Sequence, residues 1–199
     1  MALAIVAGCA TVSGDSGSDG GKARAVELMK AGFRANGQAG MDRLDQDDVQ
    51  RICDGQPDSE ARSAERAALE KKELDAVKYP ADGKLLGSYA AGEKIAQVGV
   101  GFQWSDKPGA PAGGNCYACH QISKQEISFG TLGPSLYQYG KLRGDSEAIL
   151  RYTWAKIYNA KAYNACSNMP RFGHKGILTE QQIKDVMALL LDPASPVNQ

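Results

Sequence analysis

The sequence has no surplus of charge and no long apolar run. Its 23 lysine and arginine residues balance 23 aspartate and glutamate residues, so the formal net charge is zero. Nucleic-acid-binding proteins usually carry a basic excess, and the balance argues against that class. No window approaches the roughly 18 consecutive apolar residues that a membrane-spanning helix needs. The composition therefore favours a globular chain of 199 residues with one modest core.

Histidine is scarce, with two residues, whereas there are five cysteines. An odd cysteine count excludes a framework in which every cysteine forms an internal disulfide, so at least one has another role. One motif, Cys116-Tyr117-Ala118-Cys119-His120, contains two of the cysteines and one histidine. This C-x-x-C-H pattern is typical of covalent haem attachment. We expect thioether bonds from Cys116 and Cys119 to one haem c, with His120 as the proximal iron ligand.

Two other interpretations of the motif remain open. A C-x-x-C pair can be a redox-active dithiol, and it can be half of a zinc site. Zinc would need a second pair of ligands at a suitable spacing, and Cys166 with His174 does not form one. Haem attachment is the interpretation that the motif favours.

The second axial ligand decides what such a haem does, because a filled position favours electron transfer and an open one favours ligand binding or catalysis. The candidates are Met169, Met187, His174, Met29 and Met41. Met187 lies in the apolar stripe of a predicted C-terminal helix, which favours core packing. Met169 lies in a turn-prone loop, and Pro170 keeps its backbone extended. We expect Met169 to be the distal ligand, with His174 as a rival and a core-packed Met169 as the alternative.

Helical periodicity runs through most of the chain, and no stretch alternates long enough to predict a strand. Helices are expected within residues 22–78, over 85–98, over 145–158, and after Thr179, where a capping-box-like sequence ends at Gln182. We therefore predict an all-α protein. It consists of a class I cytochrome c-like haem domain over residues 79–199 and an N-terminal helical extension over residues 22–78.

Residues 1–21 resemble the remnant of an export signal followed by a tether. Val6-Ala7-Gly8-Cys9 resembles a bacterial lipobox, in which the cysteine becomes the lipidated first residue of the mature protein. The tract over residues 13–21 is rich in glycine and serine, which is typical of a flexible tether. We expect Cys9 to be a lipidation site. The alternative is an ordinary irregular terminus.

Cys53 and Cys166 are the remaining cysteines. Haem attachment through cysteines takes place outside the bacterial cytoplasm, where disulfides also persist. A bond between the two would tie the N-terminal extension to the loop that carries Met169. Closing a loop of about a hundred residues would stabilise the fold by roughly 4–5 kcal/mol. The alternative is two separate buried thiols.

The haem motif and four further stretches together resemble the SoxX family, the monohaem cytochrome c subunits of SoxAX complexes in sulfur-oxidising bacteria. The stretches lie at residues 133–136, 168–173, 178–179 and 190–198. Their most specific parts are Met-Pro-Arg-Phe-Gly and Asp-Pro-x-Ser-Pro-Val-Asn. The resemblance covers residues 79–199 well and residues 22–78 more weakly.

The resemblance implies an electron-transfer subunit of an L-cysteine S-thiosulfotransferase, with no catalytic residue in this chain. In that family a SoxA subunit conjugates thiosulfate to a cysteine of the SoxYZ carrier, and the two released electrons reach the SoxX haem. His120 and Met169 match the family's iron ligands, and Cys116 and Cys119 match its attachment positions. A SoxA-like heterodimer partner, an indirect SoxYZ-like carrier and a small periplasmic electron acceptor are therefore expected. The expected location is the periplasm, with a lipid anchor at Cys9.

Two other functions remain open. One is a free-standing class I electron carrier for another periplasmic oxidoreductase. The other is a haem enzyme or gas sensor with an open iron position, which a Met169 ligand opposes. The extension of about sixty residues favours a chain that docks on a partner, since a diffusing carrier needs little beyond its haem domain.

Overall fold

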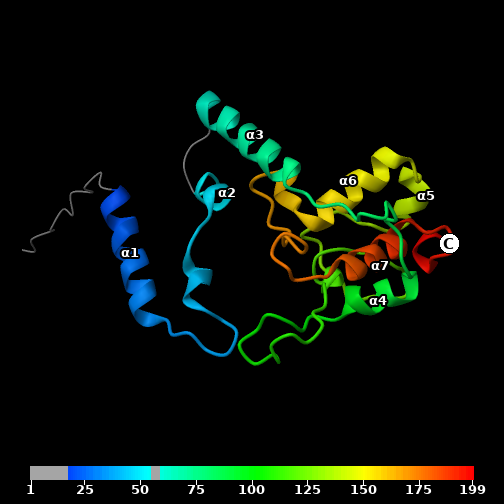
Figure 1. The fold of residues 1–199 in the computed structure, drawn as a ribbon, viewed down its shortest axis with the longest axis horizontal. Helices are drawn as coiled ribbons and strands as arrows, with labels where there is room; N and C mark the ends of the chain where they lie inside the picture. Colours follow the sequence, from blue (N-terminus) through cyan, green and yellow to red (C-terminus); the bar gives the residue numbers. More distant parts are fainter. Residues whose placement is uncertain (1–17, 55–58) are drawn as a thin grey trace, which may run out of the picture. The chain divides into compact units, whose positions relative to one another are not determined.

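The computed structural model describes residues 18–54 and 59–199 (Figure 1). The chain divides into two compact units, residues 1–34 and 35–199, and each is described by itself. The predicted lipidation site Cys9 and most of the predicted tether lie outside the described residues. In the part of the chain that is described, no helix is long and apolar enough to cross a membrane.

The first unit contributes the helix α1 (Ser18–Gly32). It begins within the stretch predicted as a tether, so residues 18–21 are helical rather than part of a flexible linker. Gly20 and Gly21 each cost about 1 kcal/mol in a helix relative to alanine, so the sequence alone indicated a linker there.

The second unit is helical. Its α-helices are α2 (Asp48–Arg51), α3 (Glu60–Asp75), α4 (Tyr89–Gln97), α5 (Tyr139–Arg143), α6 (Glu147–Tyr158) and α7 (Glu180–Leu191). Short 3-10 turns accompany them at η1 (Met41–Leu44), η2 (Cys116–Ala118), η3 (Ala160–Ala162) and η4 (Pro196–Asn198). Among the described residues, extended pairing is limited to one isolated bridge between Asn36 and Ala39. The all-α prediction is confirmed.

The core is organised around α7, which packs against α4 and α6. Gly92 of α4 lies directly on the backbone of α7, because a Cβ atom there would come within 2.1 Å of the Asp185 carbonyl oxygen. Met187 is fully buried in α7, as its place in the apolar stripe predicted. Trp154 of α6 is also buried, and its indole N–H donates a hydrogen bond to the Lys78 carbonyl (2.9 Å). These contacts fix the helices on which the loops of the second unit rest.

The predicted capping box at the start of α7 is confirmed. The Thr179 hydroxyl accepts a hydrogen bond from the Gln182 backbone N–H (3.2 Å), and the Gln182 side chain accepts one from the Thr179 N–H (3.0 Å). Thr179→Ala removes the hydroxyl, so we expect the free energy of unfolding in urea to fall by about 1 kcal/mol. Thr179→Ser keeps an acceptor and is expected to match the parent. Equal stability of the alanine and serine variants would contradict this role.

The segment between residue 35 and α3 is attached to the rest of the second unit. A disulfide joins Cys53, just after α2, to Cys166 (S–S 2.07 Å). Helix α3 begins after the cap Ser59 and has no buried residue. Its Glu70 carboxylate nevertheless accepts a hydrogen bond from the Ala165 N–H (2.8 Å), and its Glu73 carboxylate accepts one from Asn159 (2.6 Å). The disulfide and α3 thus both hold the region that leads to Met169.

Candidate haem site

The C-x-x-C-H motif forms the tight turn η2. The turn starts after Asn115, whose backbone is left-handed (φ 46°). The N–H groups of Cys119 and His120 both donate to the Cys116 carbonyl, at 3.1 and 2.9 Å. Both cysteines of the motif carry free thiols, and burial raises the pKa of Cys116 to about 12. The turn therefore presents two free thiols, the groups that add to the two vinyl groups of a haem.

A backbone carbonyl fixes the orientation of His120. Its ring Nδ1 lies 2.7 Å from the Pro134 carbonyl oxygen. Because a carbonyl only accepts, Nδ1 carries the proton and donates it, which leaves the Nε2 lone pair for a metal. Gly133 makes this close approach feasible, since a Cβ atom there would stand 2.1 Å from His120 Cε1. The site thus holds an imidazole in the tautomer that an axial ligand needs.

A buried tyrosine links the motif to α4. Tyr117, between the two cysteines, is 4 % exposed. Its phenol oxygen lies 3.1 Å from both carboxylate oxygens of Glu93 and 3.0 Å from the Ser123 hydroxyl. Burial raises the pKa of Tyr117 to about 12, so the group stays a hydrogen-bond donor at neutral pH. Sequence reasoning missed this contact, because nothing in the spacing of Glu93 and Tyr117 indicates that they meet.

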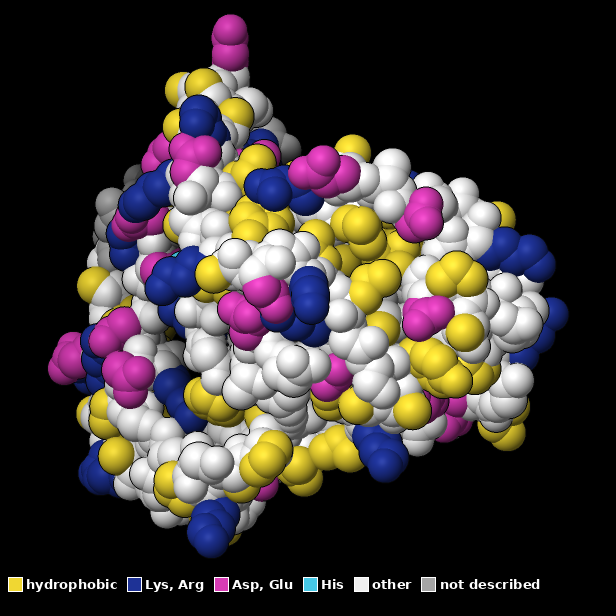
Figure 2. Space-filling view, turned by 45° about the vertical axis from the view of Figure 1, so that its right-hand side comes forward, with side chains coloured by type: hydrophobic (Ala, Val, Ile, Leu, Met, Phe, Trp, Pro, Cys, Tyr) yellow, Lys and Arg dark blue, Asp and Glu magenta, His cyan; other side chains and the backbone are white. Residues whose placement is uncertain are grey.

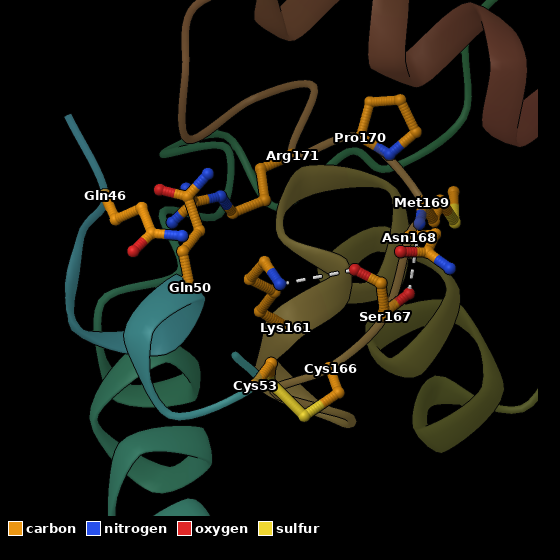
Figure 3. Close-up of a pocket in the computed structure, with 10 residues that line it drawn as sticks. All are labelled: Gln46, Gln50, Cys53, Lys161, Cys166, Ser167, Asn168, Met169, Pro170 and Arg171. Carbon is orange, nitrogen blue, oxygen red and sulfur yellow. Dashed lines mark hydrogen bonds between the residues drawn. A yellow bond between two sulfur atoms is a disulfide. The ribbon is translucent and has the colours of Figure 1, made fainter. Parts of the chain in front are cut away.

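Met169 lies on the loop between η3 and α7, half-buried against the core. Its N–H donates to the Ser167 hydroxyl (3.2 Å). It lines a pocket whose other side is formed by Gln46 and Gln50 of the α2 region, at the left of Figure 3. A loop residue of this kind can direct a flexible thioether toward an iron. The assignment of Met169 as distal ligand stays a prediction.

The other candidate ligands have different surroundings. His174 is partly exposed, and its Nδ1 lies 3.9 Å from the Glu73 carboxylate. Burial lowers the pKa of His174, more than the nearby carboxylates raise it. Met187 is enclosed in the core, Met41 lies in η1, and Met29 belongs to α1 in the first unit. The structure therefore gives Met187 a packing role and leaves His174 as the rival on the same loop.

The donor set fits haem c. Two thiols on one turn and an imidazole with a free Nε2 are the groups that such a haem requires from the proximal side. Hydrophobic side chains gather on the face turned forward in Figure 2, and Ile127 and Leu132, on the segment after His120, are 88 % and 90 % exposed. Apolar surface is thus available to a large apolar group. Within residues 18–54 and 59–199, no three His, Cys, Asp or Glu side chains are grouped to hold a metal ion by themselves.

Comparison with known proteins identifies a domain of this chain. The sequence model of the cytochrome c family matches residues 107–192, a range that contains the haem motif and Met169. An uncharacterized lipoprotein from Aquifex aeolicus is 36 % identical over 155 residues, which are 77 % of this chain and 73 % of that protein. Residues 107–192 of this chain are a cytochrome c domain. Covalently bound haem c is therefore the cofactor of this cytochrome, and electron transfer is its general function.

Proposed function

We propose that this cytochrome carries one haem c and is the SoxX-like electron-transfer subunit of a SoxAX-type L-cysteine S-thiosulfotransferase. The observation that carries the proposal is the set of SoxX-like stretches around residues 168–173 and 190–198. Both stretches are built into the fold. Arg171 is 7 % exposed and Ser195 is fully buried, and the Asn198 side chain accepts hydrogen bonds from the N–H groups of Gly140 and Lys141 (3.0 and 3.2 Å).

The residues of the site suit electron transfer without a substrate at the metal. When bound, haem c supplies an iron that alternates between its ferrous and ferric states. Cys116 and Cys119 hold the group covalently, and His120 is oriented by the Pro134 carbonyl. Met169 would hold the iron as its second protein ligand, which would leave no position on the metal for a substrate. A thioether ligand also favours the ferrous state, which suits an acceptor of electrons.

The partners follow from the same resemblance. A SoxA-like subunit would form the heterodimer and deliver electrons, a SoxYZ-like carrier would accept the thiosulfate-derived group, and a small periplasmic protein would take the electrons away. The similarity to a protein named a lipoprotein supports a lipid anchor at Cys9 and an extracytoplasmic, periplasmic location.

Co-production with a SoxA-like subunit tests this function. We expect the two chains to purify together through a tag on the SoxA-like subunit. Thiosulfate and a SoxYZ-like carrier should then reduce the haem of this chain, as followed by its absorbance. A carrier without its acceptor cysteine is the control and should give no reduction. If no heterodimer forms and thiosulfate leaves the haem oxidised, a free-standing electron carrier becomes the better interpretation.

A further inference from the structure

The loop that carries Met169 is held at both ends by one short segment of the N-terminal extension. Cys166, three residues before Met169, is bonded to Cys53. Arg171, two residues after it, forms an ion pair with Asp47 (Nη2–Oδ2 2.5 Å). Residues 47–53, which contain α2, therefore tie the loop on either side of Met169. We refer to residues 47–53 as the α2 clamp.

The ion-pair tie is rigid because Asp47 is itself fixed. Asp47 is the N-cap of α2, where its Oδ1 accepts a hydrogen bond from the Gln50 N–H (3.1 Å) and its own N–H donates to the Gln50 side chain (2.9 Å). Its other oxygen, Oδ2, faces Arg171 and lies 3.7 Å from Lys175 Nζ. The desolvation of Asp47 is outweighed by the Arg171 hydrogen bond and charge, which lower the pKa of Asp47. The carboxylate thus stays ionised opposite a guanidinium that is 7 % exposed.

A third contact holds the loop, and it comes from η3, the turn that directly precedes the loop in the chain. The Lys161 ammonium, on η3, donates to the carbonyls of Ala165 (2.6 Å) and Ser167 (3.3 Å). A pocket of about 400 Å³ lies between the α2 clamp and the loop, with the disulfide at one end and Arg171 reaching toward Gln50 at the other (Figure 3). Met169 also lines this pocket, together with Ser167 and Asn168. The ties therefore hold the same short stretch of backbone that carries the thioether.

We propose that the α2 clamp positions the Met169 thioether and sets how firmly it stays on the iron. This inference rests on the proposed function, in which Met169 is the distal ligand. The reason is entropic: the chain from η3 to α7 is a long loop without an α-helix of its own, and untying it multiplies the backbone conformations it samples. A neutral thioether competes poorly with other iron ligands once the loop that carries it is released from the α2 clamp. His174, on the same loop, is a nitrogen donor that could then take its place.

The two ties can be cut separately in the full holoprotein. Asp47→Asn removes the charge that Arg171 faces, and the double variant Cys53→Ser/Cys166→Ser removes the disulfide. For each variant we expect added imidazole to displace Met169 from ferric haem roughly tenfold faster, the factor that corresponds to 1.4 kcal/mol. The sulfur-to-iron charge-transfer band should weaken as well. Asp47→Glu keeps the charge and should lie between Asp47→Asn and the parent.

Two control variants separate positioning from general destabilisation. Asp48→Asn alters the neighbouring carboxylate, which pairs with the exposed Arg51 and Lys72 and not with the loop. Ser146→Ala removes the N-cap of α6, at the end of that helix remote from η3. Both should keep the parent displacement rate, although Ser146→Ala unfolds more easily.

The outcomes are distinguishable. If imidazole displaces Met169 no faster in Asp47→Asn than in Asp48→Asn, the clamp proposal is overturned. This outcome is decisive even where the double cysteine variant is produced too poorly to be measured. If the parent protein lacks the charge-transfer band, or keeps it after Met169→Ala, the ligand assignment fails instead. If imidazole displaces Met169 as fast in Ser146→Ala as in Asp47→Asn, and faster than in the parent, the loss of overall stability alone accounts for the faster displacement.

Discussion

Met169→Ala is expected to abolish the sulfur-to-iron charge-transfer band of the ferric cytochrome and to lower its reduction potential by a few hundred millivolts. The band requires a thioether on the iron, and alanine supplies none. The potential falls because a thioether favours ferrous iron, and axial ligands move haem potentials over about 0.8 V in all. Visible spectroscopy and redox titration measure the two effects. Carbon monoxide should also bind the ferrous variant readily, since one axial position is open.

The control for Met169→Ala is Met187→Leu. Met187 is fully buried in α7, and leucine preserves most of its volume. This variant should keep both the band and the parent potential. Persistence of the band in Met169→Ala would contradict the assignment and direct attention to the remaining methionines. Loss of the band in Met187→Leu but not in Met169→Ala would identify Met187 as the ligand.

Gly133→Ala is expected to prevent normal assembly of the holoprotein. The new methyl group would lie 2.1 Å from Cε1, 2.5 Å from Nδ1 and 2.7 Å from Nε2 of His120. The imidazole would have to leave its position, and its hydrogen bond to the Pro134 carbonyl would be lost. Since that hydrogen bond orients Nε2, we expect the haem-to-protein ratio of the purified chain to fall about tenfold, as loss of an outer-shell partner can cost 10–100-fold.

Gly32→Ala is the matched control for Gly133→Ala. A Cβ atom at Gly32 meets nothing within 4 Å, and alanine is the better helix former in α1. Its haem content, measured by absorbance of the reduced pyridine complex against protein concentration, should equal that of the parent. Full haem content in Gly133→Ala would mean that the 133–134 backbone yields easily and does not orient His120.

Local patterns predicted the parts of the site that are encoded within a few residues. The C-x-x-C-H spacing identified both thiols and His120, and the Thr179–Gln182 sequence identified the start of α7. These features depend on short-range geometry that any such sequence imposes. The disulfide between Cys53 and Cys166 agrees with the expected pairing, to which two separate buried thiols were the alternative.

Contacts between distant residues could not be predicted in the same way. Asp47 and Arg171 are 124 positions apart, and Tyr117 meets Glu93 of another helix. Each of these residues has a charge or hydroxyl that would be ordinary on a surface, so its sequence context does not reveal a buried partner. The early start of α1 was missed for a different reason, since glycine and serine indicate a linker more strongly than a helix.

The disulfide also bears on the order in which the chain matures. Its closed loop spans 113 positions and contains Cys116, Cys119 and His120. Before haem is attached, Cys53, Cys116, Cys119 and Cys166 are four of the chain's five thiols, and any four cysteines allow three pairings. Thioether formation withdraws two of them, so Cys53 and Cys166 can no longer pair with Cys116 or Cys119. Attachment of haem before oxidation would therefore exclude the wrong pairings within this set, whereas earlier oxidation would leave open a pairing that blocks the haem thiols.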